Sequence, residues 1–427
     1  MNILLKDARL IDPLTRRDEM VDLLILNGII EKIGKQINAA NDVGEMNLRG
    51  NIVTPGFIDM HVHLREPGYE YKETIETGTL AAAAGGFTAV CCMPNTKPAI
   101  DDASVIRFIR ERASRVNGGI VDVYPVAAVT MAREGKQLSP MIELAEAGAV
   151  GFSDDGDPVR DAEVMRRALE YAVMTDRPII QHAEETSLTK GGVMNEGFVS
   201  TSLGMPPMPS VAEEIIVSRD LDLVAYTQAQ YHVAHISTAG AVEKVRSARK
   251  KGLCVTCEVS PHHFTLDEEA VRSFSTNTKM NPPLRSREDV ESMKEGLRDG
   301  TIDVIASDHA PHSYDDKEVE FLQAPFGIVG LETALGLALT ELVVPGILSI
   351  MSLVEKFSSN PRRILHLPQI RVVEGEMANL TLIDPAAEWT VDVGAFKSKS
   401  KNSPFGGWKL RGRAIGIINN DQVLLTD

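Results

Sequence analysis

The sequence predicts an α/β fold, namely a (β/α)8 TIM-like barrel with a small β domain formed from both chain ends. Two observations support this prediction. Short apolar runs alternate with amphipathic stretches through the middle of the chain, and strand-and-turn patterns are confined to its two ends. Strands that alternate with helices are typical of parallel sheets, and eight such units close a barrel. The 427 residues are enough for one barrel and a small second domain.

The two chain ends share a β-rich character. At the N-terminal end the apolar runs are 3–5, 23–26 and 29–33, with turn signals at Asp12-Pro13 and Asn27-Gly28. At the C-terminal end they are 379–383 and 414–419. We therefore predict one composite β domain from residues 1–53 and 367–427, and a barrel over residues 54–366.

The middle of the chain contains eight apolar runs, as many as a (β/α)8 barrel needs. They span residues 57–63, 88–93, 120–129, 149–155, 178–182, 232–235, 253–259 and 302–308. Amphipathic segments such as 161–174, 211–223 and 287–297 lie between them. Two connections, 185–210 and 312–327, are long, and long connections in a compact barrel are typically functional lids.

Charge and composition exclude several classes of protein. The chain has 44 Lys and Arg against 60 Asp and Glu, a net charge of −16, which disfavours nucleic-acid binding because that affinity comes from clustered basic residues. The apolar run 80–93 is shorter than the roughly 20 residues of a membrane span. Lys6, Asp7 and Arg9 interrupt any signal-peptide core. Four cysteines do not make a disulfide scaffold, so we expect a soluble, cytoplasmic protein.

Histidines and aspartates gather at the ends of the predicted strands. His61 and His63 lie two apart on one strand, so both side chains project to the same face. Other strand ends carry His182, His235, Asp308 and the pair Asp154-Asp155. In a barrel these ends meet at the C-terminal rim, where active sites lie. Imidazoles and carboxylates that converge there predict a divalent-cation site, with zinc favoured.

Motifs along the chain resemble the amidohydrolase superfamily in its dihydroorotase form. The first is PGFIDMHVHLREPG (55–68), on the first predicted barrel strand. The others are MPNT (93–96), FSDDG (152–156), QHAE (181–184), AHIST (234–238), PHH (261–263), MNPPLR (280–285), ASDHAPH (306–312), APFG (324–327) and SKSKNSPF (398–405). The resemblance covers essentially the whole chain.

The resemblance implies a zinc centre with one or two ions, two being favoured. The ligands that it implies are His61, His63 and Asp308 for one metal, and His182 and His235 for the other. An aspartate of the Ser-Asp-Asp-Gly segment would stand where many superfamily members have a carboxylated lysine that bridges the metals. Asp154 and Asp155 point to opposite faces of a strand, so only one can face the metals. The family's spacing favours Asp155, with Asp154 as the alternative.

The implied activity is the reversible cyclisation of N-carbamoyl-L-aspartate to (S)-dihydroorotate in pyrimidine (UMP) biosynthesis. A metal-activated hydroxide would attack the ring amide in the hydrolytic direction, with Asp308 as general base and then general acid. Arg65 would pair with the substrate carboxylate. The substrate-binding residues that the resemblance implies are His63, Arg65, Asn95, Asn281, His312, Phe326 and Gly327.

Two alternatives stay open on the sequence. One is a related cyclic amidohydrolase, such as a hydantoinase, dihydropyrimidinase or allantoinase, which Arg65 and Asn95 disfavour. The other is a non-catalytic scaffold for aspartate transcarbamoylase, which the filled ligand positions disfavour. The resemblance also implies a homo-oligomer, in the form of a dimer, and is compatible with association with aspartate transcarbamoylase.

Overall fold

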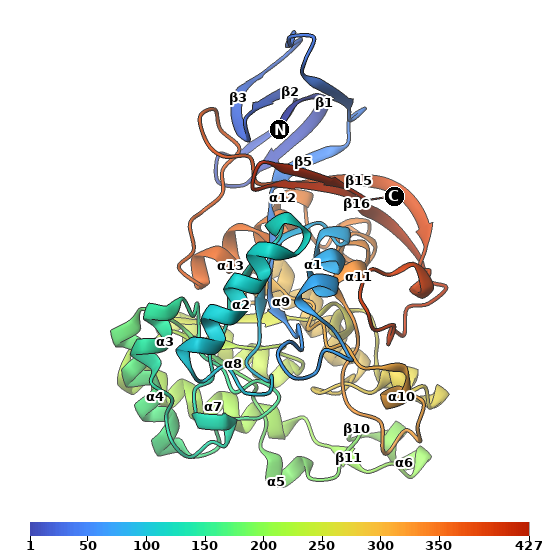
Figure 1. Cartoon of the computed structure of the whole chain (residues 1–427). Helices are drawn as coiled ribbons and strands as arrows, with labels where there is room; N and C mark the ends of the chain where they lie inside the picture. The colour runs from blue at the N-terminus through green and yellow to red at the C-terminus, as the bar shows by residue number, and fades with distance from the viewer. Residues whose placement is uncertain (427) are drawn as a thin grey trace.

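The computed structural model describes residues 1–426 and consists of a barrel of parallel strands with a β-sheet at one end (Figure 1). The strands of that sheet are β1 (Asn2–Asp12), β2 (Arg17–Leu26), β3 (Ile29–Gly34), β4 (Gly44–Asn47), β5 (Ile52–Pro55), β15 (Leu380–Thr390), β16 (Lys409–Asn419) and β17 (Gln422–Leu425). Their order is β17-β16-β15-β5-β1-β2-β3, and β4 pairs with β1.

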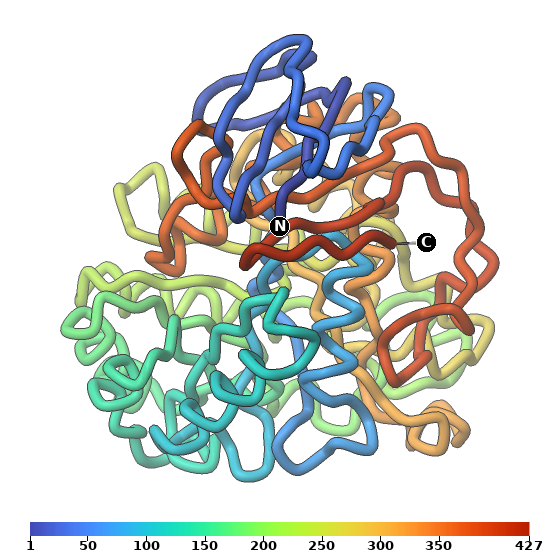
Figure 2. The backbone as a smooth tube through the Cα atoms, turned by 45° about the horizontal axis from the view of Figure 1, so that its top comes forward, coloured from blue at the N-terminus to red at the C-terminus, as the bar shows by residue number. Residues whose placement is uncertain are grey.

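Strand β5 connects the two chain ends. It runs parallel to β1 and antiparallel to β15, with Leu380 opposite Pro55. The N-terminal and C-terminal strands accordingly lie side by side in both views (Figures 1 and 2). A single mixed sheet therefore contains both β-rich ends, while the domain limits at 53/54 and 366/367 stay a prediction.

Eight strand segments form the barrel, in the order in which the chain presents them. Seven are strands, namely β6 (Phe57–Val62), β7 (Phe87–Cys92), β8 (Asp122–Pro125), β9 (Ile179–Gln181), β12 (Tyr231–Val233), β13 (Val255–Val259) and β14 (Val304–Ile305). The fourth segment is reduced to Phe152, which bridges to Ala127 on one side and to Ile179 on the other. A parallel bridge between Val62 and His309 joins the last segment to the first. The predicted barrel fold is thus confirmed.

Helices surround the barrel and follow its strands along the chain. They are α1 (Ile75–Ala84), α2 (Ala103–Arg115), α3 (Met141–Ala147), α4 (Ala162–Thr175), α7 (Val211–Thr227), α8 (Ala239–Lys250), α9 (Arg287–Asp299), α11 (Leu331–Ala338), α12 (Ile350–Phe357) and α13 (Ser359–Ile364). Local sequence sets their ends: Ser286 and Asp289 form a capping box at the start of α9, and Gly300 ends it with a φ of 82°.

The junction between sheet and barrel is tightly packed. Gly56 lies between β5 and β6, and a Cβ there would approach Asn379 Oδ1 to 1.8 Å and Thr88 Oγ1 to 2.3 Å. Only glycine fits this approach. Because β5 leads directly into β6, the sheet fixes the entry of the first barrel strand.

The long connection over residues 185–210 contains four short elements, and its role as a lid stays a prediction. It contains α5 (Thr186–Thr189), β10 (Met194–Asn195), α6 (Phe198–Leu203) and β11 (Pro207–Met208), with β10 and β11 paired in parallel. The connection over 312–327 contains α10 (Tyr314–Lys317). All these elements lie at the end of the barrel away from the sheet (Figure 1). Among residues 1–426, no helix is long and apolar enough to span a membrane.

Candidate active site

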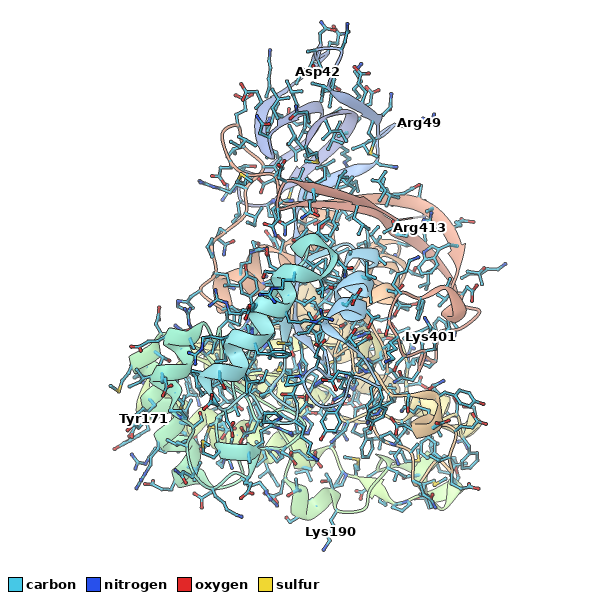
Figure 3. The ribbon with its side chains drawn as sticks, in the orientation of Figure 1. Asp42, Arg49, Tyr171, Lys190, Lys401 and Arg413 are labelled. Atoms are coloured by element: carbon cyan, nitrogen blue, oxygen red, sulfur yellow. The ribbon has the colours of Figure 1, made fainter. Side chains whose placement is uncertain are left out.

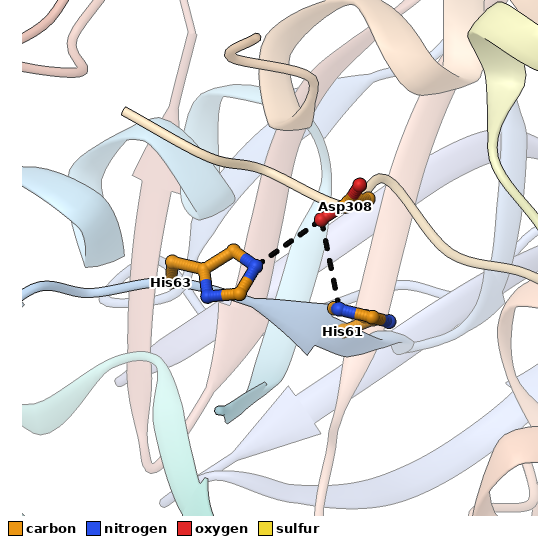
Figure 4. Close-up of side chains that lie close together, drawn as sticks. All are labelled: His61, His63 and Asp308. Carbon is orange, nitrogen blue, oxygen red and sulfur yellow. Dashed lines mark hydrogen bonds and ion pairs between the residues drawn. The ribbon is translucent and has the colours of Figure 1, made fainter. Parts of the chain in front are cut away.

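His61, His63 and Asp308 meet at the C-terminal end of the barrel. His61 and His63 lie at the end of β6, and Asp308 follows β14 (Figure 4). Asp308 Oδ1 lies 3.2 Å from His63 Nε2 and 3.5 Å from His61 Nε2. Asp59 connects the two segments, because its carboxylate accepts hydrogen bonds from the backbone N–H groups of His61 and Ser307.

Asp155 lies at the centre of the cluster. Its Oδ1 is 3.3 Å from His61 Nε2 and 3.4 Å from His235 Nε2, and its Oδ2 is 3.5 Å from His63 Nε2. Burial raises the pKa of Asp155, but the charge of His61 and the close approach of the His235 and His61 ring nitrogens outweigh this effect and lower the pKa well below its usual range. The neighbouring Asp154 faces away, and its carboxylate accepts from the backbone N–H of Thr130 at 3.0 Å.

His182 and His235 complete the cluster from the neighbouring strand ends. His182 Nδ1 lies 2.9 Å from His235 Nε2 and 3.8 Å from Asp155 Oδ1. The other ring nitrogen of His182, Nε2, is 2.9 Å from Glu184 Oε2. The six candidate ligands named from the sequence therefore lie together.

The donor set fits a borderline-soft divalent cation. Two triads, His61/His63/Asp308 and His61/Asp155/His235, have potential ligand atoms within 4.8 Å of one another. His61 Nε2 and Asp155 Oδ1 are buried and have no hydrogen-bond partner among the described residues. Buried polar atoms are normally paired, so these two unpaired atoms are suited to bind a ligand between them. Imidazole nitrogens with carboxylate oxygens are a typical zinc donor set.

Backbone strain occurs at the same place. Asp308, His235 and Arg65 have φ values of 47°, 30° and 61°, in the left-handed region that non-glycine residues rarely adopt. Such conformations persist where the surrounding structure imposes them, and they concentrate at functional sites.

Glu258 supports this centre and was missed by sequence reasoning. It is fully buried on β13, and its Oε1 lies 2.5 Å from His61 Nδ1. Its Oε2 lies 3.3 Å from His232 Nε2. A carboxylate that accepts from one ring nitrogen leaves the other, His61 Nε2, free to bind a metal. The available signal was a single charged residue within the strand sequence VTCEV.

Replacing Glu258 with glutamine is expected to weaken zinc binding about 10-fold to 100-fold, because the neutral amide holds the His61 ring less strongly. Titration with a competing chelator measures the affinity. Glu66→Gln is the matched control, since Glu66 is also buried but accepts from Ile75 N–H and pairs with Arg112. Equal zinc affinities for the two variants would contradict this role of Glu258.

The predicted carboxylate-binding residues Arg65 and His312 lie, with Lys72, in a positively charged region next to the cluster. Burial lowers the pKa of Arg65 to about 10, which leaves it charged at neutral pH. Its Nε donates to the carbonyl of Pro311 at 3.2 Å. His312 donates from Nε2 to the carbonyl of Phe326 at 2.8 Å and accepts at Nδ1 from Lys72. Burial, with Arg65 and Lys72 nearby, lowers the pKa of His312 to about 2, so its ring is neutral.

The remaining predicted substrate residues contact this centre or one another. Asn95 Oδ1 accepts from His63 Nδ1 at 2.8 Å, and Asn281 Nδ2 donates to Glu184 at 2.8 Å. Gly327 donates its backbone N–H to the carbonyl of Lys279. An open cavity of about 680 Å³ is lined by Glu184, Asn281 and Phe326, among others. Its lining reaches the cluster through Glu184 and Asn281, which both contact His182 Nε2.

Fold and site together define a (β/α)8-barrel enzyme of the amidohydrolase class, with a candidate metal centre at the C-terminal rim. Residues 50–241 match the family model described as Dihydro-orotase-like. The chain is 52% identical over 425 residues to a dihydroorotase of Syntrophus aciditrophicus, covering 99% of each chain. It is 49% identical to a dihydroorotase of Acetivibrio thermocellus, covering 100% of this chain and 99% of the relative. The chain belongs to the dihydroorotase family.

Solved structures support the same fold. The L-hydantoinase of Arthrobacter aurescens superimposes with a TM-score of 0.88 at 24% identity, covering 99% of this chain and 96% of that one. The dihydropyrimidinase of Brevibacillus agri NCHU1002 superimposes with a TM-score of 0.84 at 22% identity, covering 100% of this chain and 95% of that one. At these identities the likeness concerns the fold alone.

Proposed function

We propose that this chain is a zinc-dependent dihydroorotase that interconverts (S)-dihydroorotate and N-carbamoyl-L-aspartate in pyrimidine synthesis. The observation that supports it most is the placement of Arg65, a charged guanidinium directly beside the histidine–aspartate cluster. Family membership supports the same reaction, because the relatives of about 50% identity from Syntrophus aciditrophicus and Acetivibrio thermocellus carry the name dihydroorotase.

The proposed zinc ligands are His61, His63, Asp155, His182, His235 and Asp308, with two ions favoured. A bound zinc ion would supply a water of lowered pKa and would polarise the substrate carbonyl. Glu258 and Asn95 would orient His61 and His63 through the ring nitrogens that face away from the centre. The buried setting of the cluster strengthens these electrostatic interactions.

Asp308 is the proposed proton carrier. Burial raises the pKa of its carboxyl, but the hydrogen bond from His63 and the charges of His61 and His63 outweigh this and lower the pKa below its usual range. Asp308 therefore starts as a carboxylate that can accept a proton from the attacking water. As the ring C–N bond breaks, the same proton passes to the leaving nitrogen. Ring closure reverses these steps, so Asp308 serves as base and then as acid in both directions.

Arg65 is the proposed selectivity residue. Its two terminal nitrogens make no hydrogen bond to any other described residue, so they are available to a ligand. A guanidinium matches the planar, bidentate geometry of a carboxylate. Dihydroorotate carries such a carboxylate and dihydrouracil does not. Asn95, Asn281, His63, His312 and the Phe326–Gly327 backbone would complete the substrate pocket.

Replacing Arg65 with alanine is expected to raise KM for dihydroorotate at least about 30-fold, because a charged partner that pairs with the substrate carboxylate away from bulk water is worth about 2 kcal/mol or more. Zinc content should stay that of the wild type, since Arg65 is not a proposed ligand. Arg65→Lys is the matched variant, which keeps the charge and loses the bidentate geometry. Unchanged KM in both variants would contradict this role.

A substrate panel tests the proposed activity against its nearest alternative. Hydrolysis of dihydroorotate, hydantoin, dihydrouracil and allantoin by the purified chain is compared at equal concentration. We expect a preference for dihydroorotate of at least about 100-fold, because a site with a partly buried arginine penalises a ring without the carboxylate. Preference for a neutral ring would instead favour a hydantoinase or dihydropyrimidinase.

The proposal includes a cytoplasmic location and a homodimer, with association with aspartate transcarbamoylase compatible with catalysis. The acidic net charge of −16 supports a protein without nucleic-acid partners. A scaffold without activity is disfavoured, because each proposed ligand position carries a histidine or an aspartate.

A further inference from the structure

Asn402 lies in a C-terminal segment that runs from the sheet to the active-site end of the barrel. This segment, residues 396–405, follows β15, and Lys401 marks its place beside the barrel in Figure 3. It is anchored at several points: Ser398 N–H donates to Glu332 at 3.0 Å, and Ser400 Oγ donates to the carbonyl of Lys72 at 2.6 Å. Phe405 is buried in a cluster of apolar side chains with Ile328 and Val329 among its members.

The side chain of Asn402 connects two separate parts of the proposed substrate pocket. Its Oδ1 accepts from the backbone N–H of His312 at 3.1 Å. Its Nδ2 donates to the carbonyls of Ala310 and Gly327, at 3.0 and 3.1 Å. The Asn402 carbonyl also accepts from Val329 N–H at 3.0 Å. The side chain is 5% exposed, so no solvent replaces these bonds.

These contacts lie immediately next to the proposed chemistry. Ala310 is two residues after Asp308, and His312 and Gly327 belong to the proposed carboxylate pocket. His312 is itself bonded to the carbonyl of Phe326, so the two parts of the pocket already touch. Asn402 connects the same two parts through three side-chain hydrogen bonds. These bonds need both the carbonyl acceptor and the NH2 donors of an amide.

We propose that Asn402 is a positioning residue that sets the spacing between the His312 and Phe326–Gly327 parts of the substrate pocket. The C-terminal segment thereby contributes to substrate affinity without touching the substrate. This inference rests on the proposed function, since it assigns these backbone parts to substrate binding. Small displacements of positioning groups have large effects on a bound substrate.

A second buried asparagine provides a matched control. Asn419, at the end of β16, donates from Nδ2 to the carbonyls of Ile120 and Thr88 and accepts at Oδ1 from Asn379. It is 3% exposed, close to the 5% of Asn402. Thr88 lies at the start of β7, Ile120 and a further acceptor, Asp122, lie at the start of β8, and Asn379 directly precedes β15, all at the sheet end of the barrel rather than the active-site end. Asn419→Asp therefore removes comparable bonds away from the pocket.

The test compares Asn402→Asp, Asn402→Ala and Asn419→Asp in the zinc-loaded full chain. Asparagine to aspartate keeps the shape but sets an oxygen against the Ala310 and Gly327 carbonyls, and alanine removes all three side-chain bonds. For both Asn402 variants we expect KM for dihydroorotate to rise about tenfold, with kcat within about threefold and zinc content unchanged. Asn419→Asp should lower Tm and leave KM at the wild-type value.

Amide hydrogen exchange without substrate gives an independent readout. Residues 310–316 and 325–330 should exchange faster in both Asn402 variants than in the wild type, and at the wild-type rate in Asn419→Asp. If one Asn402 variant fails to fold, the other carries the same comparison. The inference would be overturned if the Asn402 variants kept the exchange rates and KM of the wild type. It would also be overturned if KM changed equally in the Asn402 and Asn419 variants. Failure of the wild type to open dihydroorotate would instead refute the proposed function, and exchange would still decide whether Asn402 holds the pocket.

Discussion

Asp308→Asn is expected to lower kcat for dihydroorotate by about three orders of magnitude in both directions of the reaction. The amide has the shape of the carboxylate but cannot take a proton from water, and general acid–base catalysis typically contributes 10²–10⁴-fold. The side chain lies 3.2 Å from His63 Nε2 and 3.5 Å from His61 Nε2, so it also contributes to the metal centre. Steady-state kinetics with zinc content measured on the same sample separate the two effects.

Asp220→Asn is the matched control for this variant. Asp220 is a buried carboxylate on α7 that accepts from the Tyr231 hydroxyl at 2.8 Å and pairs with Arg219. Its loss should lower stability and leave kcat within a few-fold of the wild type. A zinc-loaded Asp308→Asn enzyme that keeps more than a tenth of wild-type kcat would contradict the role of Asp308 as proton carrier.

Asp155→Asn is expected to weaken zinc binding by more than about 100-fold and to abolish turnover, since the loss of a ligand exceeds the 10-fold to 100-fold effect of losing its hydrogen-bond partner. Asp155 lies within 3.5 Å of ring nitrogens of three histidines, and an amide there removes the negative charge that a dication requires. Equilibrium dialysis against zinc measures the affinity directly.

Asp154→Asn offers a control one residue away on the same segment. Asp154 is equally buried but bonded to Thr130, and burial raises its pKa to about 6. Its amide variant should bind zinc as tightly as the wild type. If Asp154→Asn lost the metal and Asp155→Asn kept it, the other aspartate of the pair would be the ligand.

The barrel could be predicted from the sequence because its strands read as separate apolar runs. Strand-end histidines then follow from the geometry of parallel strands, which places His61, His182 and His235 at one rim. The fourth strand was harder, since only Phe152 makes bridges within the predicted run 149–155. The short elements within 185–210 were not predicted, because β10 and β11 are two residues each and depend on each other for pairing.

The residues that sequence reasoning missed act through contacts distant in the chain. Glu258 is 197 residues from His61, and Asn402 is 75 residues from Gly327. Neither follows a strand-end pattern: Glu258 lies within β13, and Asn402 lies in a polar segment after the barrel. Their roles depend on which segments pack together in the fold. The hydrophobic periodicity of the sequence does not contain this information. Asp154 and Asp155 illustrate the same point, since strand alternation shows that one faces inward and the structure shows which.

We propose that a histidine–aspartate zinc centre in this chain opens the dihydroorotate ring. The most direct measurement is hydrolysis of (S)-dihydroorotate by the purified chain, before chelation, after chelation and after zinc is added back. We expect turnover that disappears with the metal and returns with about one or two zinc ions per chain. Full activity in the chelated, metal-free chain, or zinc bound at the stated ratio without any ring opening, would contradict the account.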